Sequence, residues 1–302
     1  MVAWNIDRIA SLRRKLAIVT DATSGIGAET ALALAESGVQ VILAAADAEE
    51  GARLLQRIRG AYPLALVDFE MLDLASQDSV QDFSERMAWE HSHIDLLLNH
   101  AAPVPSPGRR ETEDGFEMHL GAGYLGPFAL TLRLLPRLLA APAPRVVTMT
   151  TLAHRRGRIH FDDLQMKRCY RAATAQCQSS LAALIFALEL DRLARARGWE
   201  LMSNAAHPGL TRTGLLQGLP RMLEPFLGQS PSSGALPAVF AATAPQAEGG
   251  MLYGPDGICE MRGQPHRAHI PGEARDRDIA ARLWDVSERL TGVSVSPFRL
   301  AA

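Results

Sequence analysis

The chain has 302 residues, 47% of them hydrophobic, and its 31 Lys and Arg against 33 Asp and Glu residues give a formal charge of -2. A charge this close to zero provides no basic surface for nucleic acid or for an anionic membrane. The sequence contains no run of 18 apolar residues, the length needed to span a bilayer, and the three cysteines form no CxxC pair. We therefore expect a cytoplasmic protein without a disulfide framework or a metal site.

Apolar segments rich in β-branched residues alternate with segments of helical periodicity. Strands are expected over 16–20, 39–44, 64–67, 94–98, 146–150, 201–206 and 251–253. Helices are expected over 27–37, 80–90, 126–139 and 181–196, where apolar residues recur three and four apart. The alternation predicts an α/β fold: a Rossmann-type, doubly wound, mainly parallel seven-stranded sheet with helices on both faces.

Three irregular segments, 102–108, 154–163 and 254–272, are rich in Pro, Gly or charge and are expected to shape a ligand crevice. A last helix, about 274–291, carries a row of apolar residues and is expected to pack onto the fold or onto a partner subunit. No repeat or break in composition marks a boundary. The sequence predicts one domain over 1–302, with a substrate-loop region at about 210–272.

The segment "LAIVTDATSGIGAETALALAESG" reads as strand, turn and helix, with Gly25 and Gly27 where the chain enters the helix. Because glycine has no side chain, the backbone N–H groups of this turn can approach a pyrophosphate at the positive end of the helix. The string does not satisfy the GxGxxG pattern. On its own, it predicts a phosphate-binding turn or a closely packed strand-to-helix connection.

This turn resembles the TGxxxGIG fingerprint of the short-chain dehydrogenase/reductase (SDR) superfamily, and further similarity covers most of the chain. The matching strings are "LDLAS" (72–76), "DLLLNHAA" (95–102), "ETEDGFE" (111–117), "RVVTMTTLAHRRG" (145–157), "AAHPG" (205–209) and "GGMLYGPDG" (249–257). The chain is most similar to the retinol-dehydrogenase-like branch. So many matches in order predict the SDR fold, but a fold does not by itself determine a function.

The resemblance implies NAD or NADP as cofactor, held without a metal. The positions that match the family's cofactor contacts are Thr20, Ser24, Gly25, Ile26, Gly27, Asp73, Asn99, Pro208, Gly209 and Thr211. Three positions depart from the pattern. Asp21 replaces the first glycine and brings a negative charge towards the pyrophosphate. Ala45 and Ala46 stand where NAD users carry an acid and retinol-like NADP users an arginine, so the sequence predicts weakened cofactor binding. Asp47 is expected to cap the next helix.

The resemblance also implies an Asn, Ser, Tyr and Lys tetrad, and all four positions have changed, to Gly123, Thr151, Gln176 and Ser180. Hydride transfer at a carbonyl carbon requires a proton to move at the oxygen, and a phenol of pKa about 10 needs a neighbouring cation to do this at neutral pH. The carboxamide of Gln176 does not titrate, and Ser180 carries no charge. We do not expect ordinary NAD(P)-dependent redox activity.

Three hypotheses remain open. The first is a repurposed scaffold that binds a small apolar molecule, or catalyses a non-redox reaction through Thr151 and Gln176. The second is a non-catalytic partner or regulatory subunit that pairs with an active relative. The third is a dehydrogenase with an unconventional proton donor, for which Tyr124, His154 and Tyr170 are candidates. SDR proteins often pair through the helices after their fourth and fifth strands, so the resemblance also suggests a homodimer.

Overall fold

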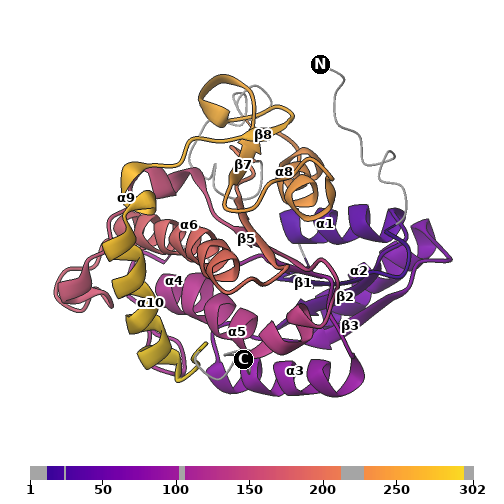
Figure 1. Cartoon of the computed structure of the whole chain (residues 1–302), viewed down its shortest axis with the longest axis horizontal. Coiled ribbons are helices and arrows are strands. Elements are labelled where there is room, and N and C mark those ends of the chain that lie inside the picture. Colours follow the sequence, from indigo (N-terminus) through magenta and orange to yellow (C-terminus); the bar gives the residue numbers. More distant parts are fainter. Residues whose placement is uncertain (1–11, 24, 102–105, 212–227, 296–302) are drawn as a thin grey trace.

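One twisted sheet runs through the molecule (Figure 1). The computed structural model describes residues 12–23, 25–101, 106–211 and 228–295. In these residues the eight strands are β1 (Leu16–Thr20), β2 (Gln40–Ala45), β3 (Val67–Met71), β4 (Leu96–Asn99), β5 (Arg145–Met149), β6 (Met202–Ala206), β7 (Leu252–Pro255) and β8 (Pro265–Arg267). Their order is β3-β2-β1-β4-β5-β6-β7-β8, with β8 alone antiparallel to its neighbour.

Helices cover both faces of the sheet, which confirms the doubly wound α/β fold. They are α1 (Gly25–Glu36), α2 (Ala48–Ala61), α3 (Gln77–Glu90), α4 (Met118–Leu120), α5 (Gly126–Leu139), α6 (Ala172–Ala196), α8 (Pro231–Thr243), α9 (Gly272–Arg275) and α10 (Arg277–Thr291). Short irregular helices are η2 (Gly121–Leu125), η3 (Leu152–Arg156), η4 (Phe161–Asp163) and η5 (Ile258–Glu260). One apolar core lies under α1, α2 and α8, and the other joins α3, α5, α6 and α10. In the described part of the chain, none of the helices is both long and apolar enough to cross a membrane.

The structure corrects three sequence-based predictions. The sheet has eight strands because β8 lies in the segment expected to be irregular, where three residues beginning with Pro265 give no strand pattern. The third strand occupies Val67–Met71 and not 64–67, and Leu64 and Leu66 are 96% and 65% exposed. An edge strand has one neighbour, so its polar residues face solvent and its pattern alternates. Helix α8 was missed because it is buried on most sides and lacks an amphipathic period.

The strand order reverses direction at β1, which lies between β2 and β4. In open parallel sheets, ligands bind in the crevice at the carboxyl ends of the strands at such a point. The connections that follow β1, β2, β4, β5 and β6 all leave the sheet at this edge. Among the described residues that the resemblance assigns to the cofactor or to the tetrad, Thr20 and Asn99 end β1 and β4. The others lie on α1, η2 and α6 or in the connections after β3, β5 and β6.

Helix α10 closes the second core, as expected for the last helix. The Trp284 ring contacts Phe128 of α5 edge-on, with centroids 5.1 Å apart, and stacks on Phe186 of α6 at 5.9 Å. The hydroxyls of Tyr124 and Ser287 lie 2.7 Å apart in the same core. The predicted single helix is divided at Asp276, whose carboxylate caps α10 by accepting from the backbone N–H groups of residues 278 and 279.

We expect the Trp284→Ala variant to unfold with a free energy lower by about 3 to 5 kcal/mol, because a buried indole leaves a cavity between three helices. Denaturant titration measures the change. Trp89 is 91% exposed at the end of α3, so the Trp89→Ala variant is the matched control and should stay within about 0.5 kcal/mol of the parent. Equal losses in the two variants would contradict this account of the core.

Candidate active site

The turn from β1 into α1 keeps the close backbone packing of a phosphate-binding turn. A Cβ at Gly27 would lie 2.3 Å from the carbonyl oxygen of Asp21, so a side chain at this position has no space. Gly25 and Asp21 both have positive φ angles, of 57° and 47°. Asp21 thus adopts the left-handed conformation that glycine would take at the same place. Helix α1 starts at the turn without an acidic residue in its first turn, which leaves its positive end available to an anion.

The Gly27→Ala variant should lose several kcal/mol of stability together with dinucleotide binding, because the clash is with main-chain atoms that cannot rotate away. Gly60 of α2 offers a matched control, since a Cβ there meets nothing within 4 Å. The Gly60→Ala variant should gain up to about 1 kcal/mol from helix propensity. Thermal unfolding with and without dinucleotide measures both effects, and a Gly27→Ala protein as stable as the Gly60→Ala protein would contradict this description of the turn.

A small cavity of about 150 Å³ opens beside this turn at the carboxyl ends of the central strands. Its lining includes Asp21, Ala45, Ala46, Asp73 and Ala122. The Asp73 carboxylate accepts a hydrogen bond from the N–H of residue 75 at 2.8 Å and so stabilises the loop that follows β3. Asp47 caps α2 as predicted, by accepting the N–H of residue 50 at 2.9 Å. Of the positions assigned to the cofactor by resemblance, Asp73 lies in this cavity, and Ser24 lies outside the described residues.

Two of the predicted cofactor contacts hold the scaffold together. The Thr20 hydroxyl donates to the backbone carbonyl of His100 at 2.6 Å and ties β1 to the end of β4. Asn99 is buried, and its amide group donates to the Thr131 hydroxyl of α5 at 2.9 Å. The Asn99 Oδ1 atom is buried without a partner among the described residues. Both residues therefore set the position of the loop after β4.

The changed tetrad positions lie together at the crevice edge. The hydroxyls of Thr151 and Ser180 are 2.9 Å apart, and Thr151 also accepts the N–H of Ala153 at 3.2 Å. Either hydroxyl can be the donor of this bond, so one of the two hydroxyl protons remains available to a ligand oxygen. Gln176 lies one helical turn before Ser180 on α6 and is half-buried. The group is neutral throughout, so it can donate hydrogen bonds but cannot exchange a proton at neutral pH.

Gly123, at the fourth tetrad position, lies in the π-helical turn η2, where the N–H of Gly126 bonds to the carbonyl of Gly121. Such turns widen a helix and are frequent at functional sites. Without a side chain, Gly123 offers only its main-chain groups. The neighbouring Ala122 lines the small cavity beside Asp21, so η2 borders the nucleotide end of the crevice.

Two of the candidate proton donors are wrong. Tyr124 is buried in the core beside Ser287, and burial raises the pKa of its phenol far above the usual value. The His154 Nδ1 atom lies 2.6 Å from the Thr151 carbonyl, which fixes the proton on Nδ1, and its Nε2 atom is buried without a partner among the described residues. Burial and the charge of nearby His207 lower the pKa of His154 to about 4. Neither group reaches a ligand oxygen with an exchangeable proton.

The other phenols and both ammonium groups of the chain lie in described segments elsewhere. Lys15 precedes β1 at the opposite edge of the sheet, 3.8 Å from Asp95, and Lys167 is exposed on the loop after η4. The Tyr253 hydroxyl accepts the N–H of Glu248 at 2.9 Å. Tyr62 follows the last residue of α2. Burial and the charge of Glu117 raise the pKa of the remaining phenol, Tyr170. In the described segments, neither lysine is therefore placed to stabilise a phenolate beside Thr151.

A larger cavity of about 730 Å³ lies where the predicted substrate region begins and ends. Its lining includes Gln229 and Ser233 on one side and Ile258, Met261 and Gln264 on the other. Its volume is in the range of pockets that hold small molecules. Two of the lining residues, Ile258 and Met261, are apolar, and the others are glycines or carry polar side chains, including Arg262. The cavity therefore offers several hydrogen-bonding groups beside a small apolar part.

Comparisons with known proteins agree with this architecture. A family model of short chain dehydrogenases matches residues 15–222. The chain belongs to the short-chain dehydrogenase family. It is 39% identical to retinol dehydrogenase 13 of Mus musculus over 95% of this chain and 86% of that protein, and 40% identical to polyprenol dehydrogenase of Mus musculus over 92% and 84%. A crystal structure of a protein from Mycobacterium paratuberculosis superposes with a TM-score of 0.83 and 33% identity, over 97% of this chain and 98% of that one.

In this short-chain dehydrogenase family member, Glu260 connects three loops of the crevice, and no local sequence pattern predicted this role. His207 accepts the N–H of Gly209 through Nδ1 at 3.2 Å, so its Nε2–H donates to the Glu260 carboxylate at 2.9 Å. The same carboxylate pairs with Arg155 of η3 at 2.7 Å and accepts the N–H of His269 at 3.0 Å. Burial alone would raise the pKa of Glu260, but these donors lower it to about 2.

The Glu260 backbone meets the Pro208–Gly209 turn directly. A Cβ at Gly209 would lie 2.4 Å from the Met261 carbonyl oxygen and 2.8 Å from that of Glu260. Glu260 and Cys259 both have positive φ angles, of 58° and 53°, a conformation that costs free energy for residues with a side chain. The strained segment is therefore held in place by the ion pair and by the close packing on Gly209.

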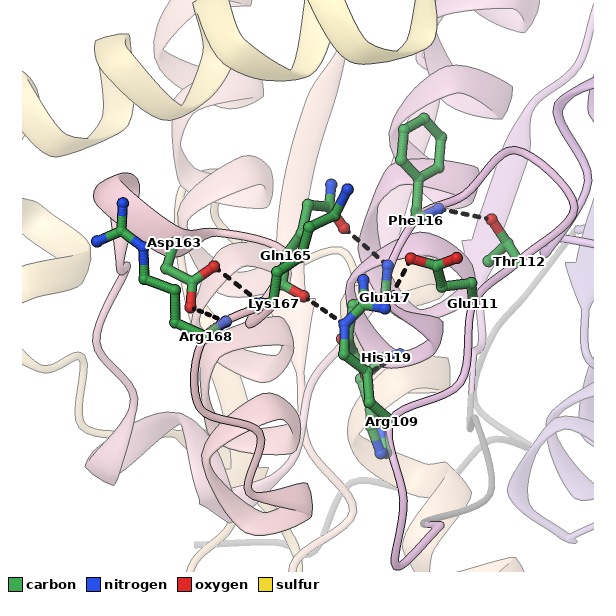
Figure 2. A network of polar contacts seen from close by, with 10 residues as sticks. All are labelled: Arg109, Glu111, Thr112, Phe116, Glu117, His119, Asp163, Gln165, Lys167 and Arg168. Atoms are coloured by element: carbon green, nitrogen blue, oxygen red, sulfur yellow. Dashed lines mark hydrogen bonds and ion pairs between the residues drawn. The ribbon is translucent and has the colours of Figure 1, made fainter.

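A second network, also missed from the sequence, holds the start of α6 (Figure 2). Gln165 accepts the N–H of Glu117 at 2.7 Å through its side chain, and its backbone carbonyl accepts from Arg109 at 2.8 Å. Figure 2 shows the two segments facing each other across these bonds. Ser179 donates to the His119 carbonyl at 2.6 Å, and Gln178 donates to the backbone of residue 164 at 2.9 Å. The two residues before Ser180 therefore fix α6 to the scaffold, while Ser180 itself bonds to Thr151.

Proposed function

We propose that this short-chain dehydrogenase family member binds a dinucleotide and a small apolar molecule in its crevice without the proton relay of an ordinary dehydrogenase. The observation that carries the proposal is the hydroxyl pair of Thr151 and Ser180, 2.9 Å apart, in place of a cation. The four tyrosines and two lysines of the chain are all engaged or placed elsewhere, so no other residue pair supplies a phenol beside an ammonium group.

The nucleotide end supports dinucleotide binding. The turn at Gly27 has the close packing of a phosphate cradle, and the first residues of α1 present backbone N–H groups there. The small cavity at Ala45 and Asp73 lies where the adenosine end of a dinucleotide binds in folds with this strand order. Pro208 and Gly209 lie at the other end, beside Glu260. A bound nicotinamide would supply or accept a hydride.

The residues around Thr151 can bind and orient a ligand oxygen. The hydroxyl pair of Thr151 and Ser180 keeps one proton that can be donated to a ligand oxygen, and the half-buried Gln176 offers both a donor and an acceptor. A carbonyl or hydroxyl oxygen bound here is polarised but does not receive a proton at neutral pH. Loss of general acid catalysis alone costs about a hundred- to ten-thousand-fold in rate. The site therefore favours binding over turnover.

A second candidate function is a slow dehydrogenase that acts on an apolar alcohol or aldehyde. The observation in its favour is the high identity to retinol dehydrogenase 13 and to polyprenol dehydrogenase over most of the chain. In the oxidation of an alcohol, the nicotinamide would accept the hydride, and the hydroxyl proton would pass through Thr151 and Ser180 to hydroxide in the solvent. The rate of oxidation would therefore rise with pH.

Titration with NADH and NADPH, followed by the fluorescence of the reduced nicotinamide, tests the proposal. We expect saturable binding that retinal or another isoprenoid aldehyde strengthens or displaces, with no consumption of the reduced cofactor above background. Slow turnover above background would overturn the proposal and establish the second candidate. Turnover at an ordinary rate, about 1 per second or faster, would overturn both, because it requires an effective proton donor. Absence of binding to both nucleotides would overturn both and leave the non-catalytic partner subunit.

A further inference from the structure

The cavity at the adenosine end has an unusual charge. Two of its lining residues are acidic, Asp21 and Asp73, while the others are alanines and leucines. No Lys, Arg or His side chain lies in this lining among the described residues. Dinucleotide-binding folds use an acidic residue to bind the ribose 2'-hydroxyl of NAD, and an arginine to accept the 2'-phosphate of NADP.

We propose that this cavity accepts an adenosine ribose with a free 2'-hydroxyl and that Asp21 excludes a 2'-phosphate. The inference rests on the dinucleotide binding proposed above, and it adds the identity of the nucleotide and the residue that selects it. Ala45 and Ala46, which line the cavity with Asp21, supply neither the usual acid nor the usual arginine. In this chain the selecting charge therefore comes from the turn after β1 and not from the end of β2.

The surroundings increase the negative potential. Helix α2 begins beside Ala46, and its cap and first turn carry Asp47, Glu49 and Glu50. Arg53, the next cation along α2, pairs with Glu50 at 2.7 Å and with Glu49 at 3.7 Å. It is thus held on the surface of its own helix. A 2'-phosphate would enter a region with an excess of carboxylates, whereas a hydroxyl can donate a hydrogen bond to one of them.

The backbone explains how Asp21 can occupy this place. At φ 47° it lies in the left-handed region, which Asp and Asn tolerate better than other residues with a Cβ. Its carbonyl oxygen packs against Gly27, and this contact holds the residue in the turn. The Asp21→Asn variant therefore preserves the conformation and the size of the side chain and removes only the charge. It is the matched test of an electrostatic role.

The experiment measures the dissociation constants of NADH and NADPH by calorimetry, and of ADP-ribose and its 2'-phosphate to isolate the adenosine end. At low salt we expect the wild-type chain to bind each unphosphorylated ligand about tenfold or more tightly than its 2'-phosphate, as a carboxylate close to a dianion implies. Salt at about 0.5 M should reduce the ratio through screening. The Asp21→Asn variant should reduce this preference for the unphosphorylated ligand about three- to tenfold, mainly because NADPH binds more tightly. The Ala46→Arg variant should bind NADPH more tightly still.

Equal affinity for NADH and NADPH, or tighter binding of NADPH, would overturn the inference and leave the proposed function intact. An Asp21→Asn variant that weakens or tightens both nucleotides by the same factor would also overturn it, because the residue would then shape the turn without selecting the nucleotide. Failure of both nucleotides and of ADP-ribose to bind the wild-type chain would overturn the proposed function itself, and the inference with it.

Discussion

The double variant Gln176→Tyr, Ser180→Lys should gain dehydrogenase turnover by about a hundred- to ten-thousand-fold over the wild-type chain. The two positions are one helical turn apart on α6, so the introduced ammonium can stabilise the introduced phenolate. Thr151 already provides the hydroxyl that binds the substrate oxygen. The measurement is oxidation of reduced cofactor by an apolar aldehyde under saturating nucleotide.

The two single variants are the controls, and each should remain close to the wild-type rate, because coupled catalytic groups act as a unit. The absorbance of the tyrosinate gives a readout that needs no substrate: the pKa of the introduced phenol should be lower in the double variant than in Gln176→Tyr by about one unit or more. If the phenol pKa falls and the cofactor binds but no aldehyde is reduced, then the substrate end has diverged as well, through Gly123 or the larger cavity.

Acidification should destabilise the fold strongly between pH 6.5 and 4. Burial lowers the pKa of both His100 and His154 to about 4. The unfolded chain binds these two protons at a pKa of about 6.5, so it takes up more protons than the folded chain in this interval, and stability falls as the pH falls. Each histidine contributes up to about 3 kcal/mol. Chemical denaturation at several pH values measures the loss.

Below this interval, Glu260 adds to the loss. Its pKa in the folded chain is lowered to about 2, so the stabilisation by its bonds to His207 and Arg155 is present above about pH 4.5 and disappears as the pH falls towards 2. The His154→Gln variant should lose part of the slope between pH 6.5 and 4, while His266→Gln, at an exposed position, should keep it. A wild-type chain whose unfolding free energy is unchanged from pH 7 to pH 4 would contradict this account, because the pKa values of these histidines would then be the same in the folded and unfolded chains.

In a dehydrogenase of this family, α6 both holds the scaffold together and carries the residues that exchange a proton. In this chain the two roles can be followed separately. Gln178 and Ser179 hold α6 through bonds to the loops before it and to residue 119, and these scaffold contacts are complete. The two positions that would exchange a proton, 176 and 180, are neutral. The scaffold contacts of α6 are therefore kept although the residues at the tetrad positions have changed, because the two sets of residues occupy different positions on the same helix.

By itself, the sequence determined the α/β class, the nucleotide turn and the loss of the tetrad. These are local features: a strand-to-helix turn with small residues, apolar periodicity, and single residues that lack a titratable group. Helix α5 was placed at Gly126–Leu139 with its observed bounds, because both of its ends and its apolar period lie in one continuous segment. The β3 strand was misplaced, since the exposed leucines at 64 and 66 imitate a buried strand.

Only the tertiary structure decided which candidates meet. Tyr124 is one residue from Gly123, yet its hydroxyl bonds to Ser287, which is 163 residues away in the sequence and is brought into contact by the packing of α10. Glu260 was not recognised because its partners, Arg155, His207 and His269, lie in separate loops that meet only where the parallel strands end. Asp21 and Asp73 likewise share a cavity only once β1, β2 and β3 lie side by side in the sheet. Such contacts depend on distances between segments remote in sequence, which no local pattern records.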